Sequence, residues 1–146
     1  MMKPIRVLLF ALLIFVFTCS ESFVDLFFYG KIHFDVNPHP NFNELFYYSF
    51  VDFQDPIYVL QKIGHMTCFF ILTLLLYSWL KRTPIVFVIA VGYACLTEFL
   101  QIIFNRDGRI FDVFVDSFGI LAALVIIYTG KQLRITSSND VEKEMK

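Results

Sequence analysis

The residues of this chain that could perform chemistry are acids, amides and bases that lie in or beside long apolar segments. Six of them lie close together in the sequence: Glu98, Gln101, Arg106, Arg109, Asp112 and Asp116. Carboxylates serve as general acids and bases, and arginines bind anionic groups. An ionisable side chain at the centre of a membrane helix costs about 2.5–3.5 kcal/mol. We therefore expect these carboxylates to be paired inside a helical bundle or to take part in function.

Helical spacing sorts the polar residues by face. Glu98 and Gln101 are three residues apart in one apolar segment, and so are Lys62 and His65 in the segment before it. In the segment after it, Asp112, Asp116 and Gly119 follow one another at steps of four and three. Residues at these spacings share one face of a helix, so each set forms a polar stripe. Stripes from three helices at one depth in the membrane predict a single shared site inside the bundle.

The residue types suggest roles within this site. The candidates for acid–base chemistry are His65, Glu98, Asp112 and Asp116. The candidates for ligand binding are Lys62, Gln101, Arg106 and Arg109. Titratable groups that gather in one cleft indicate a functional site, so the sequence predicts a centre for binding or reaction.

Each carboxylate also has a purely structural explanation. Asp112 lies near the start of its segment, where it would stabilise the positive end of a helix by about 0.3–1 kcal/mol. Asp116 lies one turn deeper and would pair with Arg106 or Arg109. Glu98 has no cation on its own helical face, so it is either neutral because of desolvation or paired across helices.

A divalent metal is an open alternative at Asp112 and Asp116. Two carboxylates four residues apart repel one another, so they need a cation, a shared proton or a metal. Arg106 is the nearest cation in the sequence. Carboxylate ligands suit Mg²⁺ or Ca²⁺, although this spacing does not by itself identify a metal site. We expect no other cofactor.

Composition predicts a small all-α membrane protein. Apolar residues make up 58% of the chain and charged residues 17%, whereas soluble domains have about 25% charged residues. Four apolar segments approach or exceed the roughly 20 residues that span a bilayer: residues 5–20, 57–80, 84–104 and 110–130. We expect a bundle of four transmembrane helices over residues 1–135 and a disordered cytoplasmic tail over residues 136–146. Its partner is expected to be membrane lipid and not nucleic acid.

Two segments near the N-terminus have particular interpretations. The first apolar segment follows Lys3 and Arg6 and ends in small residues, so a cleaved signal peptide is an alternative to a first helix.

The loop between the first and second helices carries four phenylalanines at roughly helical spacing: Phe42, Phe46, Phe50 and Phe53. This pattern predicts a short helix that lies in the membrane interface.

Basic residues predict the orientation in the membrane. With a cytoplasmic N-terminus, most of them fall inside: Lys3, Arg6, Lys81, Arg82, Lys131, Arg134, Lys143 and Lys146. The others fall outside: Lys31, Lys62, Arg106 and Arg109. Because cytoplasmic loops carry the excess of lysine and arginine, we expect a multi-pass plasma-membrane protein with both termini in the cytoplasm. The candidate site then belongs to the outer half of the membrane.

Three motifs over about residues 61–130 resemble the VanZ-like membrane proteins. They are KIGHMTCFFILTLLL from Lys62 to Leu76, TEFLQ from Thr97 to Gln101, and R-x-G-x-x-x-D-V-x-x-D-x-x-G from Arg106 to Gly119. The resemblance implies that the characteristic positions of the family are Lys62, His65, Glu98, Gln101, Arg106, Asp112, Asp116 and Gly119.

One turn departs from the pattern of that family. The family typically has Pro-Gly before the arginine, whereas this chain has Phe104-Asn105 and a turn one residue shorter. The offsets to Gly108 and Asp112 favour Arg106 over Arg109 as the family arginine.

The resemblance implies a role in the cell envelope, because the family is associated with resistance to teicoplanin-type lipoglycopeptides in Gram-positive bacteria. We expect an outward-facing polar pocket that binds or modifies an amphipathic envelope molecule, such as a lipid-linked cell-wall intermediate or a lipoglycopeptide. Arg106 would hold the headgroup, Glu98 and His65 would act as acid and base, and Asp112 and Asp116 would orient Arg106 or hold a metal.

Three other functions remain open at this point. The protein could bind or shield a ligand without any reaction, or the cluster could be a structural polar network that holds helices together. A proton or ion relay is disfavoured, because the other halves of these segments carry almost no polar residues. Whether the protein is an enzyme stays undecided.

Overall fold

The computed structural model describes residues 2–47 and 54–144, and every regular element within these residues is helical. The elements are α1 (Met2–Cys19), α2 (Phe23–Tyr29), the 3₁₀ helix η1 (Phe42–Phe46), α3 (Pro56–Leu80), α4 (Thr83–Ile103) and α5 (Ile110–Glu144). Four of them, α1, α3, α4 and α5, are long and apolar enough to cross a membrane. The predicted all-α bundle of four membrane helices is therefore confirmed.

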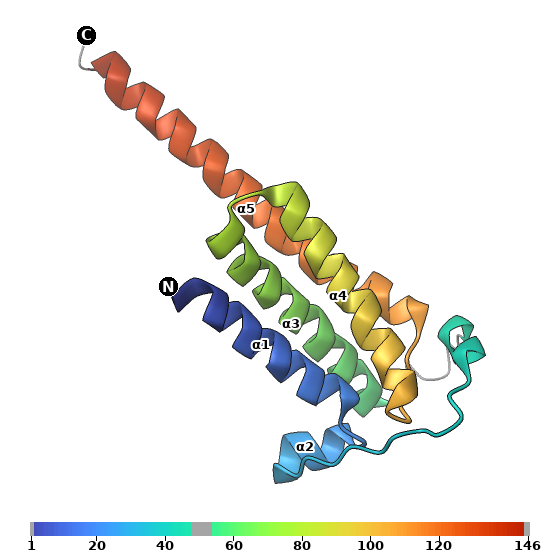
Figure 1. The fold of residues 1–146 in the computed structure, drawn as a ribbon. Helices are drawn as coiled ribbons and strands as arrows, with labels where there is room; N and C mark the ends of the chain where they lie inside the picture. The colour runs from blue at the N-terminus through green and yellow to red at the C-terminus, as the bar shows by residue number, and fades with distance from the viewer. Residues whose placement is uncertain (1, 48–53, 145–146) are drawn as a thin grey trace.

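The four long helices lie alongside one another, and α3 contacts each of the other three (Figure 1). The core between them is built from aliphatic residues and one phenylalanine: Val7, Ile14, Phe69, Leu72, Leu76, Val86, Ala90, Ala94 and Ile120. Large apolar side chains also cover the outward faces, as Leu8, Val88 and Phe118 do. A bundle that is apolar both inside and outside suits a hydrocarbon environment.

One end of the bundle carries the turn between α3 and α4. Lys81, which caps the end of α3, adopts a left-handed backbone conformation with φ of 58°, and Pro84 lies in the first turn of α4. The Lys131 ammonium of α5 donates a hydrogen bond of 3.2 Å to the Thr83 hydroxyl. Lys81, Arg82 and Lys131 therefore gather at this end, where the first residues of α1 also lie (Figure 1).

The opposite end carries the turn between α4 and α5. Its tight geometry depends on Asn105, which has a φ of 52°. Asparagine is one of the few non-glycine residues that tolerate this left-handed region. Asn105 thus provides a conformation otherwise typical of glycine, and the following Arg106 N–H donates to the Gln101 carbonyl at 2.8 Å.

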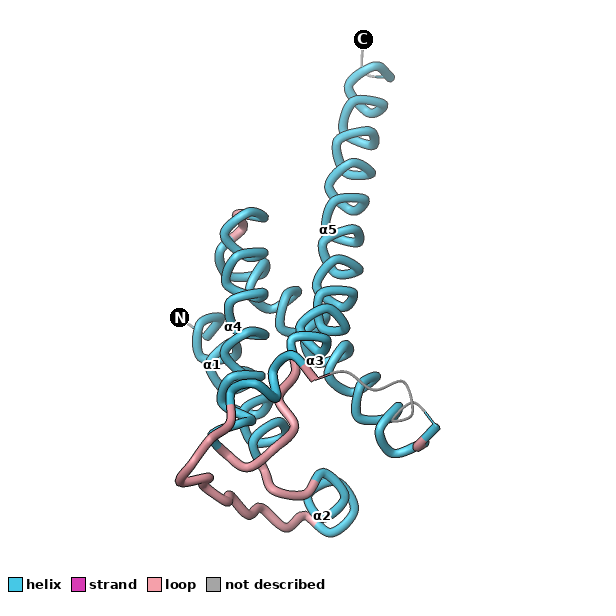
Figure 2. Tube along the Cα trace, turned by 90° about the vertical axis from the view of Figure 1, so that its right-hand side faces the viewer, coloured by secondary structure: helices cyan, strands magenta, loops and turns pink. Residues whose placement is uncertain are grey.

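The segment after α1 folds back onto this turn. Helix α2 is capped at its start by Ser22, whose hydroxyl accepts a hydrogen bond from the Asp25 N–H, and at its end by Gly30, which has a φ of 64°. The Asn37 N–H then donates to the Ile103 carbonyl at 2.8 Å, and Asn105 donates to Asp35 at 2.8 Å. Figure 2 shows that α2 and the loop after it lie at the end of the bundle away from the C-terminus.

The loop helix was predicted only in part. Residues Phe42–Phe46 form η1, a single 3₁₀ turn, whereas Phe50 and Phe53 lie outside the described residues. Helix α2 was not predicted, although Ser22 and Gly30 are ordinary start and stop signals for a helix.

The two ends of the chain have different relations to the bundle. Helix α1 contributes Val7 and Ile14 to the core, and the Tyr93 hydroxyl donates to the Ala11 carbonyl at 2.6 Å.

Helix α5 is apolar enough to span a membrane up to Arg134 and then projects beyond the other helices to Glu144 (Figure 1). The sequence predicted disorder after residue 135, whereas residues 136–144 continue α5. No glycine or proline interrupts residues 131–144, and the domain boundary at residue 135 stays a prediction.

Candidate functional site

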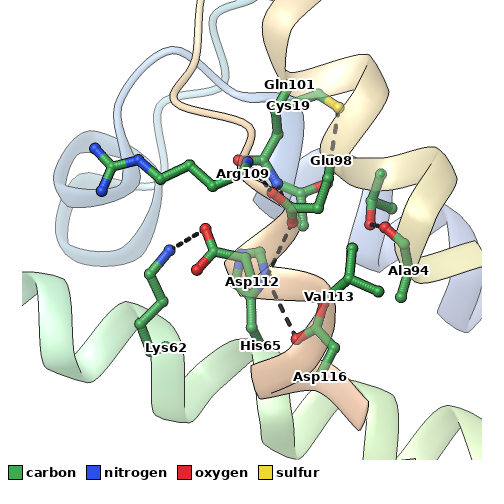
Figure 3. Close-up of polar contacts among 12 residues, drawn as sticks. Cys19, Lys62, His65, Ala94, Glu98, Gln101, Arg109, Asp112, Val113 and Asp116 are labelled. Atoms are coloured by element: carbon green, nitrogen blue, oxygen red, sulfur yellow. Dashed lines mark hydrogen bonds and ion pairs between the residues drawn. The ribbon is translucent and has the colours of Figure 1, made fainter. Parts of the chain in front are cut away.

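A group of buried polar side chains, here called the polar cluster, lies near the turn between α4 and α5 (Figure 3). Its members come from α3, α4 and α5: Lys62, His65, Glu98, Gln101, Asp112 and Asp116. Each of them is at most 8% exposed. The structure thus brings together the three polar stripes of the sequence, while the roles of these residues stay predictions.

His65 joins α3 to both neighbouring helices. Its Nδ1 lies 3.9 Å from Oε1 of Glu98 on α4 and 3.7 Å from Oδ1 of Asp116 on α5. These distances exceed those of direct hydrogen bonds, so the contacts are electrostatic. One imidazole therefore faces two buried carboxylates.

Glu98 is held from two sides. Its Oε1 accepts a hydrogen bond of 2.9 Å from the Gln101 amide, one turn further along α4. Its Oε2 accepts a hydrogen bond of 2.9 Å from the backbone N–H of Arg109. The carboxylate is 1% exposed, so its orientation toward His65 is fixed by bonds inside the protein.

Lys62 and Asp112 form a buried ion pair between α3 and α5. The Lys62 ammonium also lies 4.6 Å from the centre of the Tyr58 ring. The nearest cation in the sequence, Arg106, is not the partner of Asp112. Asp112 therefore does more than complement the start of α5, because it links two helices.

Asp116 is fully buried, and within the described part of the chain both of its oxygens lack a hydrogen-bond partner. Nδ1 of His65 and Oδ1 of Asp112 are also buried and have no hydrogen-bond partner among the described residues. A buried polar atom without a partner costs about 1–3 kcal/mol, and such atoms in a folded protein call for an explanation. The cluster thus has bonding capacity that its own side chains do not use.

The two arginines of the turn have different positions. The Arg109 side chain is buried, and its guanidinium lies 5.3 Å from the Tyr47 ring centre and 5.9 Å from that of Tyr58. The Arg106 guanidinium donates to the Glu21 carbonyl at 2.6 Å, away from the cluster. Burial lowers the pKa of Arg106, but an arginine stays protonated in proteins. Sequence offsets favoured Arg106 as the site arginine, whereas the structure brings Arg109 to the edge of the cluster.

Two glycines allow the helices that carry the cluster to approach closely. A Cβ on Gly119 of α5 would lie 2.0 Å from the Met66 carbonyl oxygen of α3. A Cβ on Gly108 would lie 2.0 Å from the Glu98 carbonyl oxygen. Small residues let membrane helices pack backbone to backbone. Gly119 thus sets the approach of α3 to α5, and Gly108 brings the Arg109 N–H to Glu98.

An apolar cavity of about 340 Å³ adjoins the polar cluster between α1, α2 and α3. Its lining includes Leu13, Phe17, Phe23, Phe27, Ile63 and His65. The sequence analysis did not predict this cavity, because its walls are mostly apolar residues, and such residues give no sign of a binding site in a sequence. His65 belongs both to the cavity wall and to the cluster.

Three cluster residues lie close enough together that they could hold one metal ion. One donor atom from each of His65, Glu98 and Asp116 lies within 4.8 Å of the other two. The sequence instead suggested Asp112 with Asp116, but Asp112 is paired with Lys62.

Comparison with known proteins agrees with the motifs. The chain matches the VanZ/LLP1 family over residues 5–131. It is 38% identical over 104 residues to the uncharacterized membrane protein YwnJ of Bacillus subtilis strain 168. The aligned region covers 70% of this chain and 73% of YwnJ. No solved structure matches the chain. The predicted family is confirmed: this multi-pass membrane protein belongs to the VanZ/LLP1 family.

Proposed function

We propose that this protein binds an amphipathic molecule of the cell envelope that carries an anionic headgroup. Its apolar chain would occupy the cavity between α1, α2 and α3, and its headgroup would lie at the polar cluster. The observation that carries the proposal is the position of His65, which lines the cavity and also faces Glu98 and Asp116. One site therefore offers an apolar wall and a polar end, as an amphipathic ligand requires.

The cavity supports the apolar half of this ligand. Its volume of about 340 Å³ lies in the range of small-molecule sites. Its lining is almost entirely apolar, with Phe17, Phe23 and Phe27 among the wall residues. Each methylene buried there would contribute about 0.8 kcal/mol relative to water, although a chain that enters from lipid gains less.

Two cations support an anionic headgroup. The Lys62 ammonium lies 4.6 Å from the Tyr58 ring centre, and the Arg109 guanidinium lies 5.9 Å from the same point. Both cations therefore gather around one ring at the edge of the cluster. Arginine and lysine together favour a phosphate or carboxylate group.

The distribution of basic residues supports an outward-facing site. Lys81, Arg82 and Lys131 gather at the end of the bundle opposite the cluster. The excess of lysine and arginine is typical of the cytoplasmic side, which supports a position of the cluster in the outer half of the membrane. A lipoglycopeptide combines an acyl chain with a polar head, so the association of the family with teicoplanin resistance agrees with this ligand class.

The cluster also supports acid–base chemistry on the bound headgroup. The two carboxylates face Nδ1 of His65, so they can orient the ring and stabilise its charged form. While no metal ion occupies these residues, His65 is the acid or base, and Asp116 is the residue that orients it.

A structural network without ligand is the second candidate function, favoured by the ion pair of Lys62 with Asp112.

A variant that fills the cavity distinguishes ligand binding from a purely structural network. Gly64 lines the cavity, and no described atom lies within 4 Å of a Cβ placed there. Gly92 on the exposed face of α4 is equally open to a side chain among the described residues, so Gly92→Leu is the matched control for Gly64→Leu.

The experiment measures bound lipid on the purified full-length protein by native mass spectrometry, with phosphatidylglycerol and with phosphatidylcholine. We expect preference for the anionic lipid, a loss of at least about tenfold in its affinity for Gly64→Leu, and no change for Gly92→Leu. In cells that gain teicoplanin resistance from the protein, the same variant should lose it. Unchanged binding by a well-folded Gly64→Leu protein would overturn the proposal and leave the structural network.

A further inference from the structure

We propose that His65, Glu98 and Asp116 bind one divalent transition-metal cation, Zn²⁺ or Mn²⁺. The proposal goes beyond the binding of an amphipathic ligand, because it requires only these three side chains. It also differs from a site at Asp112 and Asp116, since Asp112 is paired with Lys62.

The spacing of the donor atoms suits a single ion. Nδ1 of His65 lies 3.9 Å from Oε1 of Glu98 and 3.7 Å from Oδ1 of Asp116, and all three ligand atoms lie within 4.8 Å of one another. Two atoms bound to one Zn²⁺ at about 2.0–2.2 Å lie at most about 4.4 Å apart. Small rotations of the side chains therefore bring all three donors into coordination.

The charge of the cluster calls for a divalent cation. Glu98, Asp112 and Asp116 are three carboxylates, at most 1% exposed, and Lys62 supplies one positive charge. Lys62 is paired with Asp112, so Glu98 and Asp116 remain as two neighbouring carboxylates on either side of His65, and a bound cation would relieve their mutual repulsion.

Unused bonding capacity is an independent indication of a ligand. Within the described part of the chain, both oxygens of the fully buried Asp116 and Nδ1 of His65 lack hydrogen-bond partners. Nδ1 of His65 and Oδ1 of Asp116, which lie 3.7 Å apart, are two of the atoms that would hold the ion. Glu98 is held in place by Gln101 and by the Arg109 N–H, and such outer hydrogen bonds orient metal ligands in proteins.

The donor types select the metal. Imidazole nitrogen suits Zn²⁺ and other transition metals, while carboxylates also suit Mn²⁺. Mg²⁺ and Ca²⁺ prefer oxygen ligands alone, so a site with one imidazole and two carboxylates disfavours them. Three protein ligands also leave a coordination position for water or a further ligand.

The test uses the full-length protein in detergent, stripped with a chelator and then dialysed against Zn²⁺, Mn²⁺ or Mg²⁺. Mass spectrometry of the metal content should give about one Zn²⁺ or Mn²⁺ per chain and little Mg²⁺. The metal should also raise the unfolding temperature, since it binds only the folded state. A wild-type protein without bound Zn²⁺ or Mn²⁺ would overturn the proposal, whatever the variants do.

Variants locate the ion. His65→Gln and Asp116→Asn should each reduce metal affinity by at least about tenfold. His33→Gln is the matched control, because His33 is an exposed loop histidine beside Glu21. Unchanged metal affinity in a folded His65→Gln protein would contradict the site. Gly64→Leu should keep its metal while losing lipid, so a failure of the metal site is distinguishable from a failure of lipid binding.

Discussion

Gly119 of α5 lies against the Met66 carbonyl of α3 so closely that a Cβ on Gly119 would stand 2.0 Å from the oxygen. This contact lies one turn from Asp116 and one residue from His65. It therefore brings the two side chains within 3.7 Å of each other, measured from Nδ1 to Oδ1. The geometry of the polar cluster depends on a residue that has no side chain.

Gly119→Ala should separate α3 from α5 and destabilise the protein by about 1–3 kcal/mol, the usual cost of overpacking. The measurement is unfolding of the purified protein in mixed micelles. Gly130→Ala is the matched control on the same helix, because no described atom lies within 4 Å of a Cβ at Gly130. Equal stability of the two variants would show that the close approach of α3 to α5 does not matter.

Lys62→Met should leave Asp112 buried without its cation and destabilise the fold by about 3–5 kcal/mol. The double variant Lys62→Met with Asp112→Asn removes the stranded charge and should recover more than half of that loss. Unfolding in mixed micelles gives the two free energies. A double variant as unstable as Lys62→Met alone would mean that the ion pair is not the source of the effect.

Glu98→Gln should abolish acid–base function while the protein level stays normal. Glutamine still accepts the hydrogen bond of the Arg109 N–H, but it removes the charge beside His65. In cells that depend on the protein for teicoplanin resistance, susceptibility should return to that of cells without it. The control is Glu44→Gln in the exposed η1 turn. Full resistance in the Glu98→Gln strain would remove Glu98 from the chemistry.

Single cysteines test the orientation in the membrane. The native Cys19, Cys68 and Cys95 are first replaced by serine. Asp107→Cys, at a side chain that is 87% exposed in the turn between α4 and α5, should react with an impermeant maleimide added outside the cell. Lys131→Cys at the other end should react only after permeabilisation. The reverse pattern would put the cluster on the cytoplasmic side.

Local patterns were enough to predict the helices and their polar faces. A run of about 20 apolar residues marks a membrane helix, and steps of three and four put Asp112, Asp116 and Gly119 on one face of α5. Helix α4 begins at Thr83 and α5 at Ile110, each within one residue of the start predicted for its apolar segment.

The pairing of residues across helices could not be predicted in this way. Lys62 meets Asp112, 50 positions away, because Gly119 fixes the approach of α3 to α5. The choice between Arg106 and Arg109 depends on the backbone of the turn, where Asn105 adopts a φ of 52°. The cavity depends on apolar side chains of three helices, which carry no local signal of binding.

The most direct test of ligand binding uses the three histidines of the chain, His33, His39 and His65. Protein with ¹⁵N-labelled histidine is placed in nanodiscs that contain phosphatidylglycerol with a spin label near its headgroup. If this lipid occupies the cavity, the His65 ring signals broaden more than those of the loop histidines. The broadening disappears in Gly64→Leu and persists in Gly92→Leu. Sharp His65 signals at saturating lipid, or equal broadening in both variants, would contradict the account.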